Sequence, residues 1–171
     1  MRLKLVAVFL VLAFMFGAGG ASATNLVITV SKKNQNMTVA VDGEQEYIWP
    51  VSTGAKGYDT PSGEFRPFRM EKDHFSEEWD DAPMPHSIFF TGEGHAIHGS
   101  VYVKSLGRRA SHGCIRLAPA NAAKLFALVQ KAGLQNTTVV VGGGFGFSFS
   151  SFDKLGTRKG KSRFSQRLLT N

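Results

Sequence analysis

Two short segments near the start of the chain alternate apolar with polar residues, and this alternation restricts the fold more than any other feature. In "LVITV" (26–30) and "MTVAV" (37–41) every second side chain is apolar. Side chains of a β-strand point alternately to its two faces, so the pattern predicts two strands with one buried face each. The turn formers between them (33–36) and Asp42-Gly43 after them predict an antiparallel meander, completed by a third strand from Tyr47 to Val51.

The rest of the chain also reads mainly as β, with one principal helix. Further strands are predicted at Ser87–Phe90, His95–His98 and Thr137–Val141. The segment Pro119–Lys131 is predicted to be helical, because proline suits a first helical turn and Gly133 follows the last. The fold class predicted is therefore mainly β.

The first 23 residues have the features of a secretory signal peptide. Arg2 and Lys4 precede the apolar run Leu5–Phe16, and Ala21-Ser22-Ala23 forms a small-residue cleavage site before Thr24. The apolar run is short beside the ~20 residues of a membrane span. We expect a secreted, periplasmic or cell-wall-associated protein, with no transmembrane span after signal cleavage.

The positive charge of the chain is concentrated at its C-terminal end. The formal net charge is +7, yet between Thr24 and Phe152 twelve Lys and Arg balance twelve Asp and Glu. Six basic residues follow: Lys154, Arg158, Lys159, Lys161, Arg163 and Arg167. Residues 143–171 are rich in Gly, Ser and Phe and then basic, so we expect a disordered tail, either merely solvated or in contact with an anionic envelope surface. The neutral domain and the expected compartment argue against nucleic acid as a partner.

Cys114 is the only cysteine, so it forms no disulfide within the chain. A lone thiol is open to oxidation outside the cytoplasm, so it is either an inert core residue or a useful nucleophile. His112 and His98 precede it by two and sixteen residues. A neighbouring imidazolium would lower the pKa of the thiol, and Gly113 would permit a bend that frees backbone N–H groups for an oxyanion.

Two loops and a further histidine complete the candidates. The glycine-rich segment 52–67 is either two ordinary turns or a binding loop, and the acidic segment 70–85 is either solvated, with Trp79 as its apolar anchor, or a contact for substrate. His95 lies three residues before His98, so on a strand it should point to the opposite face and be structural. The same spacing argues against a zinc module built from these two histidines with His112 and Cys114, although the ligand types suit zinc. We predict no metal and no cofactor.

These motifs together resemble the active-site signature of the L,D-transpeptidases, the YkuD-like catalytic domain. The matching pieces are "IHG" around His98 and "SHGCIRL" from Ser111 to Leu117. "STG" (52–54) and "TPSGEF" (60–65) resemble the substrate-side loop of that domain. The resemblance implies a YkuD-like β-sandwich or barrel with its principal helix after the cysteine, over residues 24–142.

The resemblance also implies roles for individual residues. Cys114 corresponds to the nucleophile and His98 to the general base, whose tautomer is fixed by the carbonyl of Gly99. His112 and Gly113 correspond to residues that line the oxyanion site.

The chain departs from the common signature at one position. Arg116 stands where Asn is common, and its charge can pair with a substrate carboxylate or with an acidic neighbour. We assign Arg116, Ser111 and Trp79 to substrate binding.

The implied reaction is peptidoglycan L,D-transpeptidation in cell-wall organisation and the maintenance of cell shape. A thioester forms at the bond between the diamino acid and D-Ala of a tetrapeptide stem, and transfer to an amine gives a 3-3 cross-link. With water as acceptor the same intermediate gives L,D-carboxypeptidase activity, and with a protein amine it anchors proteins to the wall. A non-catalytic wall-binding domain is the remaining alternative.

Overall fold

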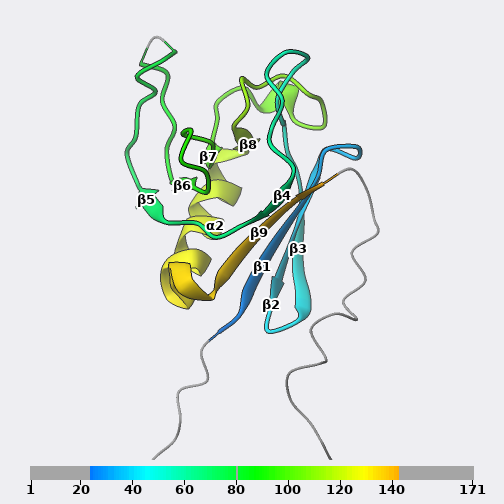
Figure 1. The fold of residues 1–171 in the computed structure, drawn as a ribbon, viewed down its shortest axis with the longest axis vertical. Helices are drawn as coiled ribbons and strands as arrows, with labels where there is room; N and C mark the ends of the chain where they lie inside the picture. The colour runs from blue at the N-terminus through cyan, green and yellow to red at the C-terminus, as the bar shows by residue number, and fades with distance from the viewer. Residues whose placement is uncertain (1–23, 80, 143–171) are drawn as a thin grey trace, which may run out of the picture.

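The computed structural model describes residues 24–79 and 81–142, which fold into two β-sheets and a helix (Figure 1). The predicted signal peptide (1–23) and tail (143–171) lie outside the described residues. No helix in the described ranges is both long enough and apolar enough to cross a membrane.

The larger sheet contains the predicted meander. Its strands follow the order β3-β2-β1-β9-β4, with bounds β1 (Leu26–Ser31), β2 (Asn36–Val41), β3 (Glu44–Pro50), β4 (Gly63–Phe65) and β9 (Thr137–Gly142). The first three strands are antiparallel, which confirms the meander. The last strand, β9, pairs in parallel with β1, which lies at least 106 residues earlier in the sequence. The alternation of apolar residues does not by itself identify this pairing.

The smaller sheet carries the candidate catalytic segments. It has the order β5-β6-β7-β8, with bounds β5 (Arg69–Glu71), β6 (Ser87–Phe89), β7 (Ala96–Gly99) and β8 (Ile115–Leu117). The strands β7 and β8 are parallel, and the connection between them contains the short 3-10 helix η2 (Val103–Ser105).

The principal helix α2 (Pro119–Ala132) follows directly after β8, as predicted, and packs against β7 (Figure 1). Gly133 ends it with φ near +88°, a conformation that suits glycine. A second 3-10 helix, η3 (Leu134–Asn136), leads into β9.

One hydrophobic core joins both sheets and the helix. The inward-facing side chains of β1, including Ile28 and Val30, pack in the same cluster as Ile97 of β7, Ile115 of β8 and Leu125 of α2. Complete burial of such side chains stabilises the fold by about 1.5–3 kcal/mol each. The core therefore fixes the position of β7 and β8, on whose other face the candidate site lies.

Candidate active site

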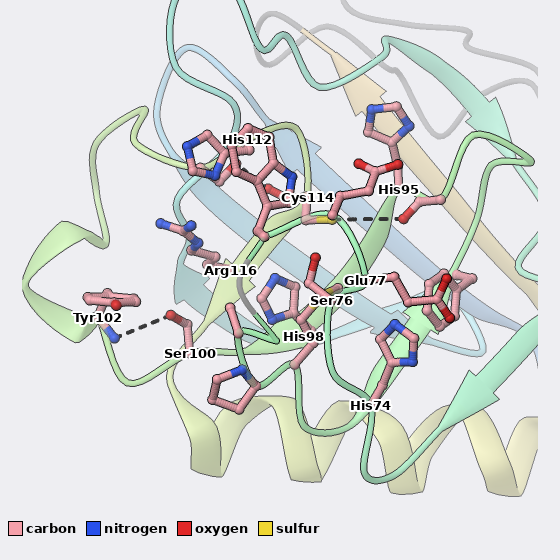
Figure 2. Close-up of a pocket in the computed structure, with 18 of the residues that line it drawn as sticks. His74, Ser76, Glu77, His95, His98, Ser100, Tyr102, His112, Cys114 and Arg116 are labelled. Carbon is pink, nitrogen blue, oxygen red and sulfur yellow. Dashed lines mark hydrogen bonds between the residues drawn. The ribbon is translucent and has the colours of Figure 1, made fainter.

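The parallel pairing of β7 with β8 brings the two predicted catalytic segments together. Ile97 is paired with Ile115, and His98 with Arg116. Both isoleucines are fully buried in the core, so the side chains of His98 and Arg116 face the opposite side of the sheet. Cys114, two residues before Arg116, lies on that same side, as Figure 2 shows.

A cavity of about 500 Å³ lies over this side of the sheet. Six of the predicted site residues line it: Ser111, His112, Cys114, Arg116, His98 and Trp79. Gly99 and Gly113 are the other two, and each adjoins a lining residue. The structure therefore brings all the predicted site residues into one region.

The imidazole of His98 is buried and held in one orientation. Its Nδ1 lies 2.8 Å from the carbonyl oxygen of Gly99. A carbonyl only accepts hydrogen bonds, so Nδ1 carries the proton and Nε2 is left with its lone pair. Burial lowers the pKa of His98 to about 4, against the opposing effect of the Gly99 hydrogen bond. The imidazole is therefore neutral at physiological pH.

The thiol of Cys114 is also neutral, contrary to the expectation from the sequence. Burial raises the pKa of Cys114, outweighing the lowering effects of the Ala96 backbone and the positive charge of Arg116. The predicted lowering by an imidazolium was wrong, because the same burial keeps His98 uncharged. The resting site is a thiol beside an imidazole rather than an ion pair.

Hydrogen bonds from the glycine-rich loop hold the cysteine segment from behind. The hydroxyl of Thr60 donates to the carbonyl of Gly113 (2.7 Å) and accepts from the backbone N–H of Gly54 (2.9 Å). A side chain at Gly54 would collide with the carbonyl oxygen of Tyr58, 1.7 Å from the Cβ position. None of residues 52–65 lines the cavity, and through Thr60 this loop supports the segment that carries the nucleophile.

Ser111 also serves the cysteine segment itself. Its hydroxyl donates to the carbonyl of Cys114 and accepts from the backbone N–H of Gly113 (3.2 Å). The side chain is almost fully buried. The hydroxyl thus stabilises the bend before the nucleophile.

The acidic segment forms an arm between β5 and β6 (72–79 and 81–86). Its two limbs are joined by backbone hydrogen bonds, such as that from Met84 to His74 (2.8 Å). Trp79 near its tip stacks on His112, with ring centroids 3.8 Å apart and an interplanar angle of 8°. Tyr58 contacts both rings edge-on. The arm is therefore docked beside the cysteine rather than simply solvated.

Arg116 is a half-buried cation in the lining of the cavity. Its guanidinium donates to the carbonyl of Ala110 (3.1 Å) and lies 5.6 Å from the centre of the Tyr102 ring. Within the described residues the ion pairs are Arg69–Glu71, His74–Glu71 and Arg109–Asp59, and none includes Arg116. Its charge is thus available to a ligand.

The structure corrects the prediction for His95. This residue lines the same cavity as His98 instead of facing away from it. β7 begins only at Ala96, so His95 belongs to the preceding turn, where strand alternation does not apply. Sequence reasoning also assigned no role to His74, which lines the cavity with Nδ1 2.6 Å from Glu71 Oε2.

The residues of the zinc alternative do not assemble as ligands. In the described ranges no group of three or more His, Cys, Asp or Glu side chains is arranged to hold a metal ion.

Comparison with known proteins gives consistent matches. The sequence model of the family described as YkuD, L,D-transpeptidase catalytic domain, matches residues 25–141. YqjB of Bacillus subtilis, which is named as an L,D-transpeptidase, is 28% identical over an alignment of 102 positions, and the match covers 53% of this chain and 58% of that protein.

Solved structures agree with this match. An L,D-transpeptidase from Mycobacterium smegmatis is 26% identical with a TM-score of 0.63, over 70% of this chain and 59% of that one. LdtMt1 in complex with imipenem gives the same identity, TM-score and coverage: 26%, 0.63, 70% and 59%. The chain spans less than two thirds of the length of each of these proteins.

Proposed function

Because the chain belongs to the YkuD family of L,D-transpeptidase catalytic domains, we propose that it is a cysteine acyltransferase acting on peptidoglycan stem peptides. The observation that carries the proposal is the relation of His98 to Cys114. A neutral imidazole, its Nδ1 bound to the Gly99 carbonyl, shares a cavity with the only thiol of the chain. This arrangement suits a base that removes the thiol proton during attack.

In the acylation half, the sulfur of Cys114 attacks the carbonyl of the diamino acid that precedes the terminal D-Ala of a tetrapeptide stem. The thiol proton passes to Nε2 of His98 as the S–C bond forms. The backbone N–H groups of His112 and Cys114 stabilise the oxyanion, beside the His112 ring, since that of Gly113 already donates to Ser111. The C–N bond then breaks, D-Ala leaves with the proton held by His98, and a thioester remains.

In the second half, the side-chain amine of another stem attacks the thioester. The C–S bond breaks and the sulfur regains a proton through His98, giving a 3-3 cross-link. Water in place of the amine would give the L,D-carboxypeptidase product, and a protein amine would give wall anchoring.

Arg116 and Trp79 are proposed to bind the stem peptide. The guanidinium of Arg116, which forms no ion pair within the described residues, would receive a substrate carboxylate, and the Trp79–His112 stack would form an aromatic wall of the cavity. Ser111 acts through the cysteine segment that it holds. We propose that the enzyme works outside the cytoplasm, in the periplasm or at the wall, where it contributes to cell-wall organisation and cell shape.

The direct test is incubation with a tetrapeptide-bearing muropeptide, with products identified by mass. A cross-linked dimer is expected from the wild type and none from Cys114→Ala. If a trimmed tripeptide is the only product, the activity is that of an L,D-carboxypeptidase rather than a transpeptidase. Binding to wall sacculi without any release of D-Ala would favour the non-catalytic alternative.

A second test follows from the imipenem complex of LdtMt1. Imipenem should add one covalent adduct to the wild type, visible by intact-mass spectrometry, and none to Cys114→Ala. The proposed nucleophile is wrong if the wild type stays unmodified or if the adduct survives the substitution.

A further inference from the structure

A second histidine lies on the opposite side of Cys114 from His98. Since Ile115 is paired with Ile97, Cys114 is level with Ala96 in the parallel ladder. His95 therefore precedes the level of the cysteine by one residue, and His98 follows it by two. Both histidines line the cavity, and Figure 2 shows them on either side of the sulfur.

The ring of His95 is held in a defined position. Its Nδ1 lies 2.8 Å from the hydroxyl oxygen of Thr91, which also accepts a hydrogen bond from the His95 backbone N–H (3.2 Å). Its Nε2 lies against Gly113, only 3.0 Å from where a Cβ would stand. Because Gly113 has no side chain, the imidazole of His95 fits directly beside this residue, which precedes the nucleophile.

The hydrogen bond to Thr91 engages one nitrogen of His95 and leaves the other available. Nδ1 and the Thr91 hydroxyl share one hydrogen bond, so in the tautomer in which Nδ1 carries the proton and donates it, Nε2 keeps its lone pair. Nε2 lies beside Gly113, and His95 lines the cavity. In this tautomer Nε2 can accept a proton.

The chemistry of the second half-reaction needs a second proton acceptor. The side-chain amine of a diamino acid arrives as an ammonium ion, since such amines have a pKa near 10.4. It must lose two protons to become an amide, whereas the sulfur of Cys114 takes back only one. His98 returns that proton to the sulfur, and with a pKa of about 4 it is a poor acceptor for the other.

We propose that His95 removes the surplus proton of the cationic amine acceptor, an inference that rests on the proposed transpeptidase function. Nε2 of His95 takes one proton from the ammonium and releases it to solvent, to which this half-buried ring has access. The resulting amine attacks the thioester, the C–N bond forms, the C–S bond breaks, and its second proton reaches the sulfur through His98. The lining of the cavity carries the three carboxylates of Glu77, Glu78 and Glu93 against the two guanidiniums of Arg69 and Arg116, and this excess of negative charge favours the approach of a cation.

This role separates transfer to an amine from the other steps. Acylation uses His98 alone, and attack by water delivers no surplus proton to be removed before bond formation. His95→Gln should therefore acylate with imipenem at a rate within about twofold of the wild type. Its ratio of cross-linked dimer to hydrolysed tripeptide should fall by about tenfold or more, in the range of general-base effects.

Two further measurements distinguish a base from a structural residue. Hydroxylamine is a neutral nucleophile at pH 7.5, so its capture of the acyl-enzyme should be unaffected in His95→Gln. Raising the pH from 7 to 9 should restore dimer formation by the variant, because the fraction of free amine rises about tenfold per pH unit. Thr91→Val should show part of the same loss of dimer formation. Thr91→Ser, which keeps the hydroxyl, should form dimer like the wild type.

The matched control is His86→Asn, a histidine outside the cavity lining whose φ of +57° suits asparagine. It should keep the wild-type product ratio. An unchanged ratio in His95→Gln, or an equal loss of transfer to hydroxylamine, would overturn the role of His95 while leaving the transpeptidase proposal intact. A wild type that forms no acyl-enzyme would overturn both.

Discussion

His98 combines a buried ring with a neutral state, and the two have a common cause. The ring is 5% exposed and bound to the Gly99 carbonyl, so little water remains to stabilise a positive charge. A base in this state accepts a proton only while bond formation at the sulfur drives the transfer. Because the folded protein keeps His98 uncharged, its stability should depend on pH.

The free energy of unfolding should fall as the pH falls from about 6.5 towards 4. Within this range the unfolded chain protonates His98, whereas the folded chain, with a pKa of about 4, does not. The loss attributable to this residue approaches about 3 kcal/mol at pH 4 and is absent above pH 7. His98→Gln should lose correspondingly less stability than the wild type between pH 7 and 4 in urea titrations.

A suitable control is Cys114→Ala, which alters the same cavity but removes no group that titrates in this range. It should retain the wild-type pH dependence. If the free energy of unfolding changes equally with pH in His98→Gln and in the wild type, then His98 is protonated in the folded state at much the same pH as in the unfolded chain.

The thiol of Cys114 offers an independent measure of the same neutral site. Titration of thiolate absorbance near 240 nm, corrected with Cys114→Ala, should give a pKa above that of free cysteine, because burial is its largest influence. Arg116→Met should raise it further, because the charge of Arg116 stabilises the thiolate. A substantial thiolate signal at pH 7 would contradict the neutral pair and restore the ion pair expected from the sequence.

At the scale of single residues, the motif spacing was sufficient to predict that Cys114 and His98 lie together, as their shared cavity confirms, but it did not give their charge states. Those depend on burial by segments distant in the chain, above all the core behind Ile97 and Ile115. His95 was misplaced for a related reason: the strand boundary at Ala96 is set by pairing with β6 rather than by local composition.

Among the elements, the glycine-rich loop has the clearest structural role. The hydroxyl of Thr60 is fully buried and joins the Gly54 N–H to the Gly113 carbonyl, the residue before the nucleophile. Loss of this hydroxyl would leave two buried backbone groups without their partner. The loop thus connects stability directly to the position of the cysteine.

Thr60→Val should lower the free energy of unfolding by about 2 to 4 kcal/mol and reduce the rate of imipenem acylation. Thr60→Ser retains the hydroxyl and should stay close to the wild type in both. Urea denaturation and intact-mass kinetics measure the two effects. If the valine and serine variants have equal stability and reactivity, the bridge does not hold the cysteine segment.

The most secure predictions among the elements had a periodic pattern. The alternation of 26–30 and 37–41 identified β1 and β2, and the helix from Pro119 was also correct. The strands β4, β5 and β8, of three residues each, are too short to show a period of two and were not predicted, although β6, which is equally short, was predicted at Ser87–Phe90. The arm was identified as a segment, yet its docking through Trp79 depends on a ring supplied by His112, 33 residues later.

On the scale of the whole molecule, a charge-neutral domain is followed by a basic tail in the sequence. Six of the twenty Lys and Arg residues follow Asp153. A variant that lacks residues 154–171 should unfold at the same urea concentration as the intact chain. It should lose only its salt-sensitive affinity for anionic wall polymers.

Co-sedimentation with purified sacculi at low and at high salt measures that affinity. The intact chain should be retained at low salt and released at high salt, and the truncated chain should be weakly retained at both. Retention of the truncated chain equal to that of the intact chain at low salt would exclude a role for the tail in wall binding.

The parallel pairing of β1 with β9 separates the two ends of the folded part. Leu26 is paired with Thr137 at one end of the ladder and Ser31 with Gly142 at the other, about 17 Å away. Gly142 accepts a hydrogen bond from Lys32, whose side chain reaches the Thr60 carbonyl behind the nucleophile. A support or fluorophore attached at Thr24 would thus lie at the end of β1 away from Lys32 and Thr60, whereas one attached after Gly142 would lie at the end that is linked to the cysteine segment. An immobilised assay of the enzyme should therefore use the attachment at Thr24.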